Sequence, residues 1–291
     1  MDMRPLSGRV ALVAGATRGA GRAIAECLGE AGATVYVTGR STRAGGSDMN
    51  RRETIEETAE RVTARGGRGI AVKVDHTVEA EVAALIERIS AEQSGRLDIL
   101  VNDIWGGDPL TEWGVPFWQH KLDNGLRIQR QAVHSHMITS YCAAPLMVNR
   151  KDGLIVEITD GVGYRYRGSL YYSLAKISAV HLAEAMAADL KEHGVTAVAV
   201  TPGFLRSEAM LELFGVTEEN WREGGKQDVH FLQSETPNYV GRAIAALAAD
   251  LDRYRWTGQS LSSWGLSEVY GFTDIDGTRP HWGRYAEENG F

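Results

Sequence analysis

Short apolar runs alternate with longer segments of mixed polarity along most of the chain. The apolar runs predict strands that are buried on both faces, because polar residues do not alternate with apolar ones within them. These predicted strands are 9–14, 34–38, 69–74, 97–101, 154–158, 196–200 and 259–262. With helices between them, they predict a doubly wound α/β fold of the Rossmann type, with a parallel sheet of about seven strands covered on both faces.

The segments between these strands carry apolar residues at intervals of three or four, which is typical of helices with one buried face. After the third strand, for example, Val82, Leu85, Ile86 and Ile89 share one face. The predicted helices are 20–31, 47–65, 79–91, 126–148, 170–193 and 239–249.

Three segments depart from this alternation. Residues 105–117 are rich in glycine, proline and tryptophan, residues 204–235 interrupt the rhythm, and residues 264–291 are aromatic and irregular. No linker or repeat divides the chain. We therefore expect one domain over residues 1–291, in which 204–235 is an excursion and 264–291 is an irregular C-terminal extension.

Composition and charge narrow the function classes. With 43% hydrophobic residues and a formal net charge of −7, the chain is typical of a globular enzyme and unsuited to nucleic-acid or anionic-membrane partners. No apolar run is long enough to span a membrane, and the N-terminal run is too short for a secretory signal. The two cysteines, Cys27 and Cys142, lack metal-ligand spacing. We expect a cytoplasmic protein that acts on a small molecule and holds no metal.

A glycine-rich segment, Ala14–Gly21 (AGATRGAG), joins the first predicted strand to a helix. Glycines here let the backbone turn sharply and approach a pyrophosphate, while the helix N-terminus supplies amide donors and a partial positive charge. The alternative is a tight strand-to-helix turn that binds nothing. Because the glycines directly follow the first strand of a βαβ unit, we interpret the segment as the phosphate loop of a dinucleotide site.

The end of the second strand selects between NAD and NADP. An acidic residue there binds the ribose 2′-hydroxyl of NAD, but this chain has Thr38-Gly39-Arg40. Arg40 and Arg18 can both form charge-assisted hydrogen bonds with the 2′-phosphate of NADP. The alternative is that both arginines are solvated surface residues. We predict NADP as the cofactor.

A tyrosine and a lysine lie four positions apart in the segment 169–176, which reads SLYYSLAK. Tyr172 and Lys176 share one face of the predicted helix, whereas Tyr171 points elsewhere. A neighbouring ammonium favours the phenolate and lowers the pKa of a tyrosine, which suits a general acid–base pair. Alone, the pair is more typical of side chains on a solvated helix surface.

In combination, these motifs resemble the short-chain dehydrogenase/reductase family over most of the chain. The glycines have the family's G-x-x-x-G-x-G spacing, and Tyr172 and Lys176 form its Y-x-x-x-K. Asp75 follows the third strand, and Asn102 lies in LVND, where the family usually has N-N-A-G. Pro202–Gly203 follow the sixth strand. The tail sequence YGFTDIDG looks like the family's "member 1-like" branch.

The resemblance implies a role for each of these positions. Tyr172 would donate a proton to a carbonyl oxygen while hydride arrives from nicotinamide, and Lys176 would hold the nicotinamide ribose and depress the pKa of the tyrosine. The two long helices, 126–148 and 170–193, would form the subunit interface of a homodimer or homotetramer, and residues 204–233 would form the substrate lid. The residues implied in cofactor binding are Gly15, Thr17, Arg18, Gly19, Ala20, Gly21, Arg40, Asp75, His76, Asn102, Tyr172, Lys176, Pro202 and Gly203.

Two positions depart from the family's catalytic pattern. The register of residues 153–163 puts Asp160 where the family has its catalytic serine, whereas the usual spacing to Tyr172 reaches Thr159. Successive strand residues point to opposite sides, so only one of the two should face the site, and we favour Asp160. The family's helix asparagine falls at Ala132.

The exchange of serine for aspartate has chemical consequences, because an ionised aspartate cannot donate a hydrogen bond to a ketone oxygen. Asp160 could be protonated and donate; it could accept from a hydroxyl or pair with a cation such as an iminium; or the site could lack redox chemistry. We predict an NADP-dependent oxidoreductase acting on a carbonyl, alcohol or imine of a small to medium apolar molecule. The alternatives are an NADP(H) sensor and a non-redox lyase or isomerase.

Two further groups of residues invite a functional interpretation. His134 and His136 do not share a helix face, so we interpret them as helix-surface or subunit-contact residues rather than metal ligands. Four aromatic residues lie where the family's loops border the substrate cleft, and they are equally suited to lining it and to packing a loop or a dimer contact. They are Trp105, Trp113, Phe117 and Trp118.

Overall fold

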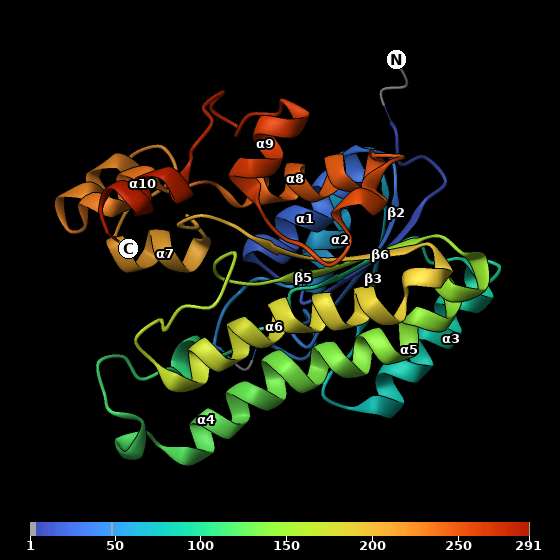
Figure 1. The fold of residues 1–291 in the computed structure, drawn as a ribbon, viewed down its shortest axis with the longest axis horizontal. Coiled ribbons are helices and arrows are strands. Elements are labelled where there is room, and N and C mark those ends of the chain that lie inside the picture. Colours follow the sequence, from blue (N-terminus) through green and yellow to red (C-terminus); the bar gives the residue numbers. More distant parts are fainter. Residues whose placement is uncertain (1–3, 48, 291) are drawn as a thin grey trace.

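The protein is described by a computed structural model that covers residues 4–47 and 49–290. One sheet has the strand order β3-β2-β1-β4-β5-β6-β7, and every neighbouring pair is parallel (Figure 1). The strands are β1 Val10–Ala14, β2 Thr34–Gly39, β3 Arg68–Lys73, β4 Ile99–Asn102, β5 Gly153–Ile158, β6 Val195–Thr201 and β7 Ser260–Ser262. This arrangement confirms the predicted doubly wound α/β fold.

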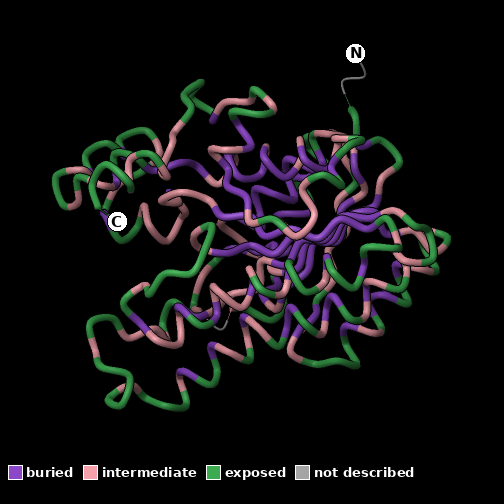
Figure 2. The backbone as a smooth tube through the Cα atoms, viewed as in Figure 1, coloured by how far each residue is buried: buried purple, intermediate pink, exposed green. Residues whose placement is uncertain are grey.

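Helices cover both faces of the sheet. One layer contains α1 Gly19–Glu30, α2 Ile55–Ala64 and α8 Pro237–Ala249, and the other contains α3 Glu79–Glu92, α5 Ser135–Arg150 and α6 Leu170–Asp189 (Figure 1). Alternate strand residues supply the two cores: Ala11 and Val13 belong to the first, and Val10 and Leu12 belong to the second. The sheet is therefore buried on both faces, as Figure 2 shows, and this explains the uninterrupted apolar runs.

The predicted strand bounds hold to within two residues, but one helix was predicted too long. The prediction of a helix over 47–65 is wrong in its first part, because α2 begins at Ile55, after Thr54 has capped it by accepting a hydrogen bond from the N–H of Glu57. Asp48 lies outside the described residues. The predicted helix 170–193 is α6 followed by a 3₁₀ turn, Lys191–His193.

The predicted helix 126–148 begins earlier, at Leu122, and is interrupted. It consists of α4 Leu122–Gln129, a π-helical turn Arg130–His134, and α5. The turn contains Ala132, the position expected for the family's asparagine. A π turn adds a residue to the helical repeat and so re-aims the side chains beyond it, and such turns are frequent at functional sites.

The expectation of an irregular extension over residues 264–291 is wrong for half of that segment, which is helical. Directly after β7 comes α9 Ser263–Tyr270, and α10 Trp282–Glu288 follows later. Between them, the buried Asp274 accepts a hydrogen bond from the N–H of Thr236 at 2.8 Å, at the N-terminus of α8. Asp274, an acidic residue of the YGFTDIDG sequence, thus links the tail to α8. Phe291 lies outside the described residues.

The excursion at residues 204–235 forms a small layer with its own apolar core. It contains α7 Glu208–Phe214 and two 3₁₀ turns, Trp221–Lys226 and Val229–Gln233, which pack around Phe214, Trp221 and Phe231. The ring of Trp282 in α10 contacts that of Phe204, with centroids 5.6 Å apart. The excursion and the C-terminal helix therefore lie side by side at one end of the molecule (Figure 1).

Two features outside the sheet edge bear on function. Within residues 4–47 and 49–290, no helix combines the length and the apolar character that crossing a bilayer requires.

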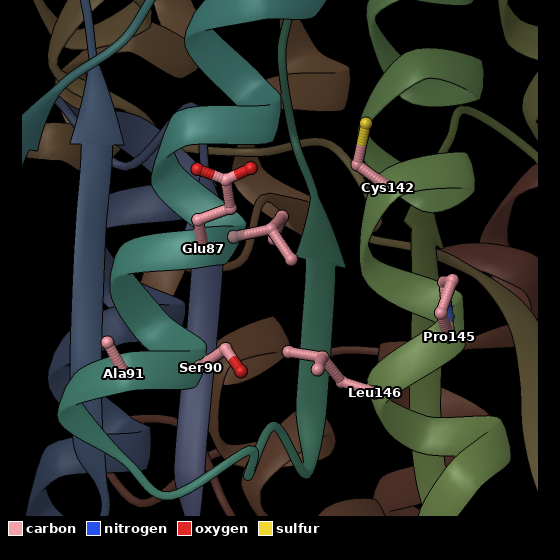
Figure 3. Close-up of a pocket in the computed structure, with 7 residues that line it drawn as sticks. Glu87, Ser90, Ala91, Cys142, Pro145 and Leu146 are labelled. Carbon is pink, nitrogen blue, oxygen red and sulfur yellow. The ribbon is translucent and has the colours of Figure 1, made fainter.

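An open groove of about 390 Å³ lies between α3 and α5, lined by Ile86, Cys142 and Leu146 among others (Figure 3). The lining of this groove includes none of the residues for which a catalytic or binding role is predicted.

Candidate active site

The predicted site residues follow strands that end at one edge of the sheet. The strand order reverses between β1 and β4, and open parallel sheets bind ligands at this place, beyond the carboxyl ends of their strands. The glycine loop follows β1, Asp160 follows β5, and Pro202–Gly203 follow β6. The fold therefore brings together segments that are far apart in the sequence.

Two glycines of the loop leave no room for a side chain. A Cβ on Gly15 would lie 2.4 Å from the carbonyl oxygen of Asp103, and a Cβ on Gly21 would lie 2.4 Å from that of Gly15. Gly15 also has a φ of +89°, which residues with a side chain rarely adopt. Thr17 and Ala20 are buried beside them. The loop thus holds the N-terminus of α1 close to the segment that follows β4.

An acidic side chain lies at the N-terminus of α1. Glu208, the first residue of α7, accepts a hydrogen bond from the N–H of Gly19 at 2.9 Å. Its other oxygen lies 4.0 Å from a guanidinium nitrogen of Arg22. The first N–H groups of a helix attract anions, so this end of α1 is shown to accept one, supplied here by the excursion.

Of the two residues predicted to bind the 2′-phosphate, Arg40 directly follows β2 and Arg18 directly precedes α1. Arg40 Nη1 is 3.9 Å from Asp75 Oδ2, so these two predicted residues are neighbours. Arg18 is turned toward Glu53, with Nη1 3.7 Å from its carboxylate, and burial lowers the pKa of Arg18. Among the described residues, this nitrogen has no hydrogen-bond partner. A buried guanidinium nitrogen without a partner retains a donor for a further anion.

Two predicted cofactor residues have enclosed side chains. His76 is 3% exposed, between the hydroxyl oxygens of Thr38 at 2.8 Å and Thr139 at 2.9 Å, and burial lowers its pKa to about 3. Asn102 is fully buried and donates to Glu157 at 2.7 Å. Both residues are enclosed in this structure, so neither presents an exposed side chain to a ligand.

Asp160 and Thr159 differ in their contacts, and only Asp160 is hydrogen-bonded to Tyr172. The hydroxyl of Tyr172 donates to Oδ2 of Asp160 at 2.9 Å. Thr159 points the other way and donates to the carbonyl oxygen of Lys176 at 2.6 Å, inside the protein. Adjacent residues at the end of β5 thus face opposite sides, as the alternation of strand side chains requires. Of the expected states, Asp160 adopts the one that accepts from a hydroxyl.

The pKa of Tyr172 differs from the expectation that Lys176 would lower it. Burial, followed by the charge of Asp160 and the hydrogen bond to it, raises the pKa of Tyr172 well above its ordinary value. Burial also lowers the pKa of Lys176, against the opposing charges of Asp160 and two other carboxylates. The Lys176 ammonium lies 4.2 Å from the centroid of the Trp105 ring and 5.6 Å from that of Tyr172.

Two members of the aromatic cluster pack on Tyr172. Its ring centroid is 5.4 Å from that of Trp105, edge to face, and 5.0 Å from that of Trp113. Phe117 and Trp118 instead contact each other, and both are more than half exposed. Trp105 and Trp113 therefore cover part of the Tyr172 ring, although Trp113 is itself exposed, whereas Phe117 and Trp118 make no ring contact with Tyr172 among those observed.

The loop after β6 is supported from one side. The N–H of Gly203 donates to Oε2 of Glu235 at 2.9 Å, and the hydroxyl of Ser263 donates to the same oxygen at 2.6 Å. Glu235 is 1% exposed, and burial raises its pKa to about 8. A Cβ on Gly203 would lie 2.7 Å from Cβ of Trp282. The excursion and the C-terminal helices thus fix Pro202–Gly203 in place.

Two charged residues of the site were missed in the sequence. Nη2 of Arg167 lies 3.4 Å from Oδ1 of Asp160. Asp103 is enclosed beside Gly21, and burial raises its pKa to about 7. Only the departure of LVND from the family's N-N-A-G pointed to Asp103, and nothing in the sequence distinguished Arg167 from the neighbouring Arg165.

His136 lies inside the protein, so its interpretation as a surface or subunit-contact residue is wrong. It is 3% exposed, with Nδ1 2.5 Å from Oε2 of Glu157 and Nε2 3.0 Å from the carbonyl oxygen of Ile104. His134 is exposed. In the part of the chain that the structure describes, no group of three or more histidine, cysteine or acidic side chains could hold a metal ion.

Comparisons with known proteins agree with this architecture. A family model described as short chain dehydrogenase matches residues 9–215. The chain is 34% identical to dehydrogenase/reductase SDR family member 1 of Mus musculus, over 94% of this chain and 85% of the relative.

Solved structures share the fold. A short chain dehydrogenase from Mycobacterium thermoresistibile has a TM-score of 0.78 at 20% identity, covering 96% of this chain and 92% of that chain. A structure assigned to an NAD(P)-dependent gluconate 5-dehydrogenase of Beutenbergia cavernae, with bound NADP, has a TM-score of 0.70 at 24% identity, covering 91% of this chain and 98% of that one. Because the family model spans most of the chain, the protein belongs to the short-chain dehydrogenase/reductase family, in the branch of family member 1.

Proposed function

We propose that this protein is an NADP-dependent oxidoreductase that transfers hydride between nicotinamide and a carbonyl, alcohol or imine of a small to medium apolar molecule. Family membership supplies the coarse class, a short-chain dehydrogenase/reductase with a nicotinamide cofactor. The observation that carries the proposal is the 2.9 Å hydrogen bond from Tyr172 to Asp160, beside Lys176 and at the sheet edge where the glycine loop lies.

The residues at this edge suit a dinucleotide. Gly15 and Gly21 let the loop pack directly against its neighbouring backbone, with no side chain between them, and α1 already presents an N–H to a carboxylate. The loop would hold the pyrophosphate, Arg40 and Arg18 the 2′-phosphate, and Lys176 the nicotinamide ribose. When bound, the nicotinamide supplies or accepts the hydride.

The proton is handled by the protein's own side chains. Tyr172 gives its proton to the substrate oxygen in reduction and takes one in oxidation. Asp160 accepts the phenolic hydrogen bond, orients the hydroxyl and makes the phenolate a stronger base. A carboxylate at this position also stabilises a cation, so an iminium is a second substrate class. Trp105 and Trp113 pack on the Tyr172 ring and help to hold the phenol in this orientation.

Two alternatives would use the same residues without net hydride transfer. An NADP(H) sensor would bind the cofactor and consume none, and a lyase or isomerase would use Tyr172 and Asp160 as an acid–base pair. Incubation of the protein and NADPH with a panel of ketones, aldehydes and cyclic imines separates them. Loss of the 340 nm absorbance of NADPH with at least one compound supports an oxidoreductase; binding of NADPH without any loss contradicts it.

We also propose a homodimer or homotetramer, with a cytoplasmic location. Large apolar side chains on α4, α5 and α6 are about half or more exposed, and burial against a second copy would remove them from water. They are Leu122, Leu126, Met137, Tyr141 and Leu174. Sedimentation velocity is expected to give a dimer or larger species, and a monomer at micromolar concentration would contradict the interface.

Replacement of Tyr172 by phenylalanine tests the acid–base role. We expect kcat to fall by about a hundredfold or more, since the proton donor is lost. NADPH affinity should change by less than about twofold, because the ring still packs on Trp105 and Trp113. Tyr171→Phe is the matched control and should retain activity. Steady-state kinetics and fluorescence titration measure the two effects, and a Tyr172→Phe variant with wild-type kcat would refute the role.

The cofactor preference is tested at Arg40. In Arg40→Asp the introduced carboxylate would repel a 2′-phosphate and accept from a 2′-hydroxyl, so NADPH affinity should fall at least about tenfold more than NADH affinity. Arg43→Asp is the control, because Arg43 is exposed and paired with Glu60 at 2.6 Å; it should leave both affinities nearly unchanged. Equal losses for the two cofactors in Arg40→Asp would contradict the choice of NADP.

A further inference from the structure

The loop between β5 and α6 places a guanidinium against the Asp160–Tyr172 pair. Nη2 of Arg167 lies 3.4 Å from Oδ1 of Asp160 and also 3.4 Å from its carbonyl oxygen. The Arg167 side chain is 27% exposed, so the contact is partly withdrawn from water. The other carboxylate oxygen of Asp160 accepts from Tyr172. One carboxylate therefore joins the arginine to the phenol.

The surrounding backbone is shaped for this contact. The N–H of Arg167 donates to the hydroxyl of Ser173, in the first turn of α6, at 2.8 Å. A Cβ on Gly161 would lie 2.1 Å from Nη2 of Arg167, so a side chain there would push the guanidinium away. Gly161 and Gly168, at the two ends of the loop, have φ values of +91° and +84°. These features fix where the loop begins and ends and leave space for the guanidinium over Asp160.

Arg167 offsets the negative charge that Asp160 places beside Tyr172, a charge that a serine at this position would not carry. Asp160 is acceptor-only when ionised, and its charge disfavours the phenolate of Tyr172 next to it. The groups that act on Tyr172 are Asp160, Asp108 and Arg167, with Lys176 at 5.6 Å from its ring. The two carboxylates raise the pKa of Tyr172, whereas Arg167 lowers it. Without Arg167, a half-buried carboxylate beside the phenol would lack its ion-pair partner.

We infer that Arg167 is a positioning residue that balances the charge of Asp160 and fixes its carboxylate toward Tyr172, and that an aspartate can occupy the serine position because this arginine accompanies it. The inference rests on the proposed oxidoreductase function for its catalytic consequence. The pairing itself can be tested without any substrate.

The direction of the expected pH effect follows from the charges. Oxidation of an alcohol needs Tyr172 as the phenolate, so the rate rises with pH toward the pKa of this group. Arg167 favours the phenolate, and its removal raises the pKa of Tyr172 further. The rising limb of the pH–rate profile should therefore move to higher pH in Arg167→Gln, and Arg167→Lys, which keeps a positive charge, should restore part of the shift.

The pairing is tested by a double-mutant cycle on stability. Arg167→Gln, Asp160→Asn and the double variant are unfolded in urea, each in the full chain. We expect Arg167→Gln to lower the unfolding midpoint in the wild-type background, because it leaves a carboxylate unpaired, and to have a clearly smaller effect in Asp160→Asn. Additive effects would overturn the inference, whatever the outcome for the proposed function.

The catalytic consequence is tested with 1-phenylethanol and NADP⁺ between pH 6 and 10. Arg167→Gln should lower kcat/KM at pH 7 by about tenfold, the equivalent of one pKa unit, and move the rising limb upward. Arg165→Gln is the matched control, since Arg165 is an exposed arginine of the same loop, and should change kcat/KM by less than about twofold.

The outcomes of this assay are distinguishable. A loss in Arg167→Gln that Arg167→Lys does not partly restore, or an equal loss in Arg165→Gln, would overturn the charge-balancing role. A wild-type protein that does not oxidise 1-phenylethanol, and that also consumes no NADPH with the carbonyl and imine panel, would count against the proposed function. The double-mutant cycle measured by urea unfolding would then decide alone whether Arg167 and Asp160 are paired.

Discussion

The hydrogen bond from the Tyr172 hydroxyl to the Asp160 carboxylate is the interaction on which this account depends. It joins the end of β5 to the first turns of α6, and so unites the sheet edge with the helix that carries Lys176. A carboxylate at this position can only accept when ionised, so it orients the phenol rather than donating to a substrate. The direction of this hydrogen bond, from Tyr172 to Asp160, therefore leaves Tyr172 as the group that exchanges a proton with a substrate in the proposed reaction.

The rest of the fold brings the cofactor elements to the same edge. The glycine loop is held against the segment after β4 so closely that no side chain fits at Gly15 or Gly21. The loop after β6 is fastened by Glu235, a buried acid whose raised pKa, about 8, favours the neutral form at pH 7. That acid and the tail helices come from the last fifth of the chain. The site therefore relies on segments beyond the sheet itself.

Much of the fold could be predicted from the sequence, because a strand that is buried on both faces is an uninterrupted run of apolar residues. Helical periodicity was enough to predict that Tyr172 and Lys176 share a helix face, whereas Asp160 was singled out only through the resemblance of its segment to the family's. The inward turn of His136 could not be predicted, because it comes after a π-helical turn that no residue type announces. The packing of the tail could not be predicted either. The buried position of Asp274 depends on its contact with Thr236, which lies 38 positions earlier in the chain.

The electrostatics of the site were the least predictable part. Charges that are remote in sequence decide the pKa of Tyr172, and periodicity gives no distances between them. Sequence reasoning considered Lys176 alone, whereas burial and Asp160 dominate in the structure. The contribution of Arg167 depends on a loop in which Gly161 has a positive φ. The conformation of such a loop, and hence the position of the Arg167 side chain, is difficult to predict from sequence.

We propose that the Tyr172 phenol, held by Asp160, faces a nicotinamide ring, and a crystal structure of the protein with NADP⁺ would test this geometry. We expect the phosphates at the N-terminus of α1, the nicotinamide beside Pro202–Gly203, and the Tyr172 hydroxyl directed toward the ring while within hydrogen-bond distance of Asp160. A dinucleotide bound elsewhere, or a Tyr172 hydroxyl turned away from the nicotinamide, would contradict it.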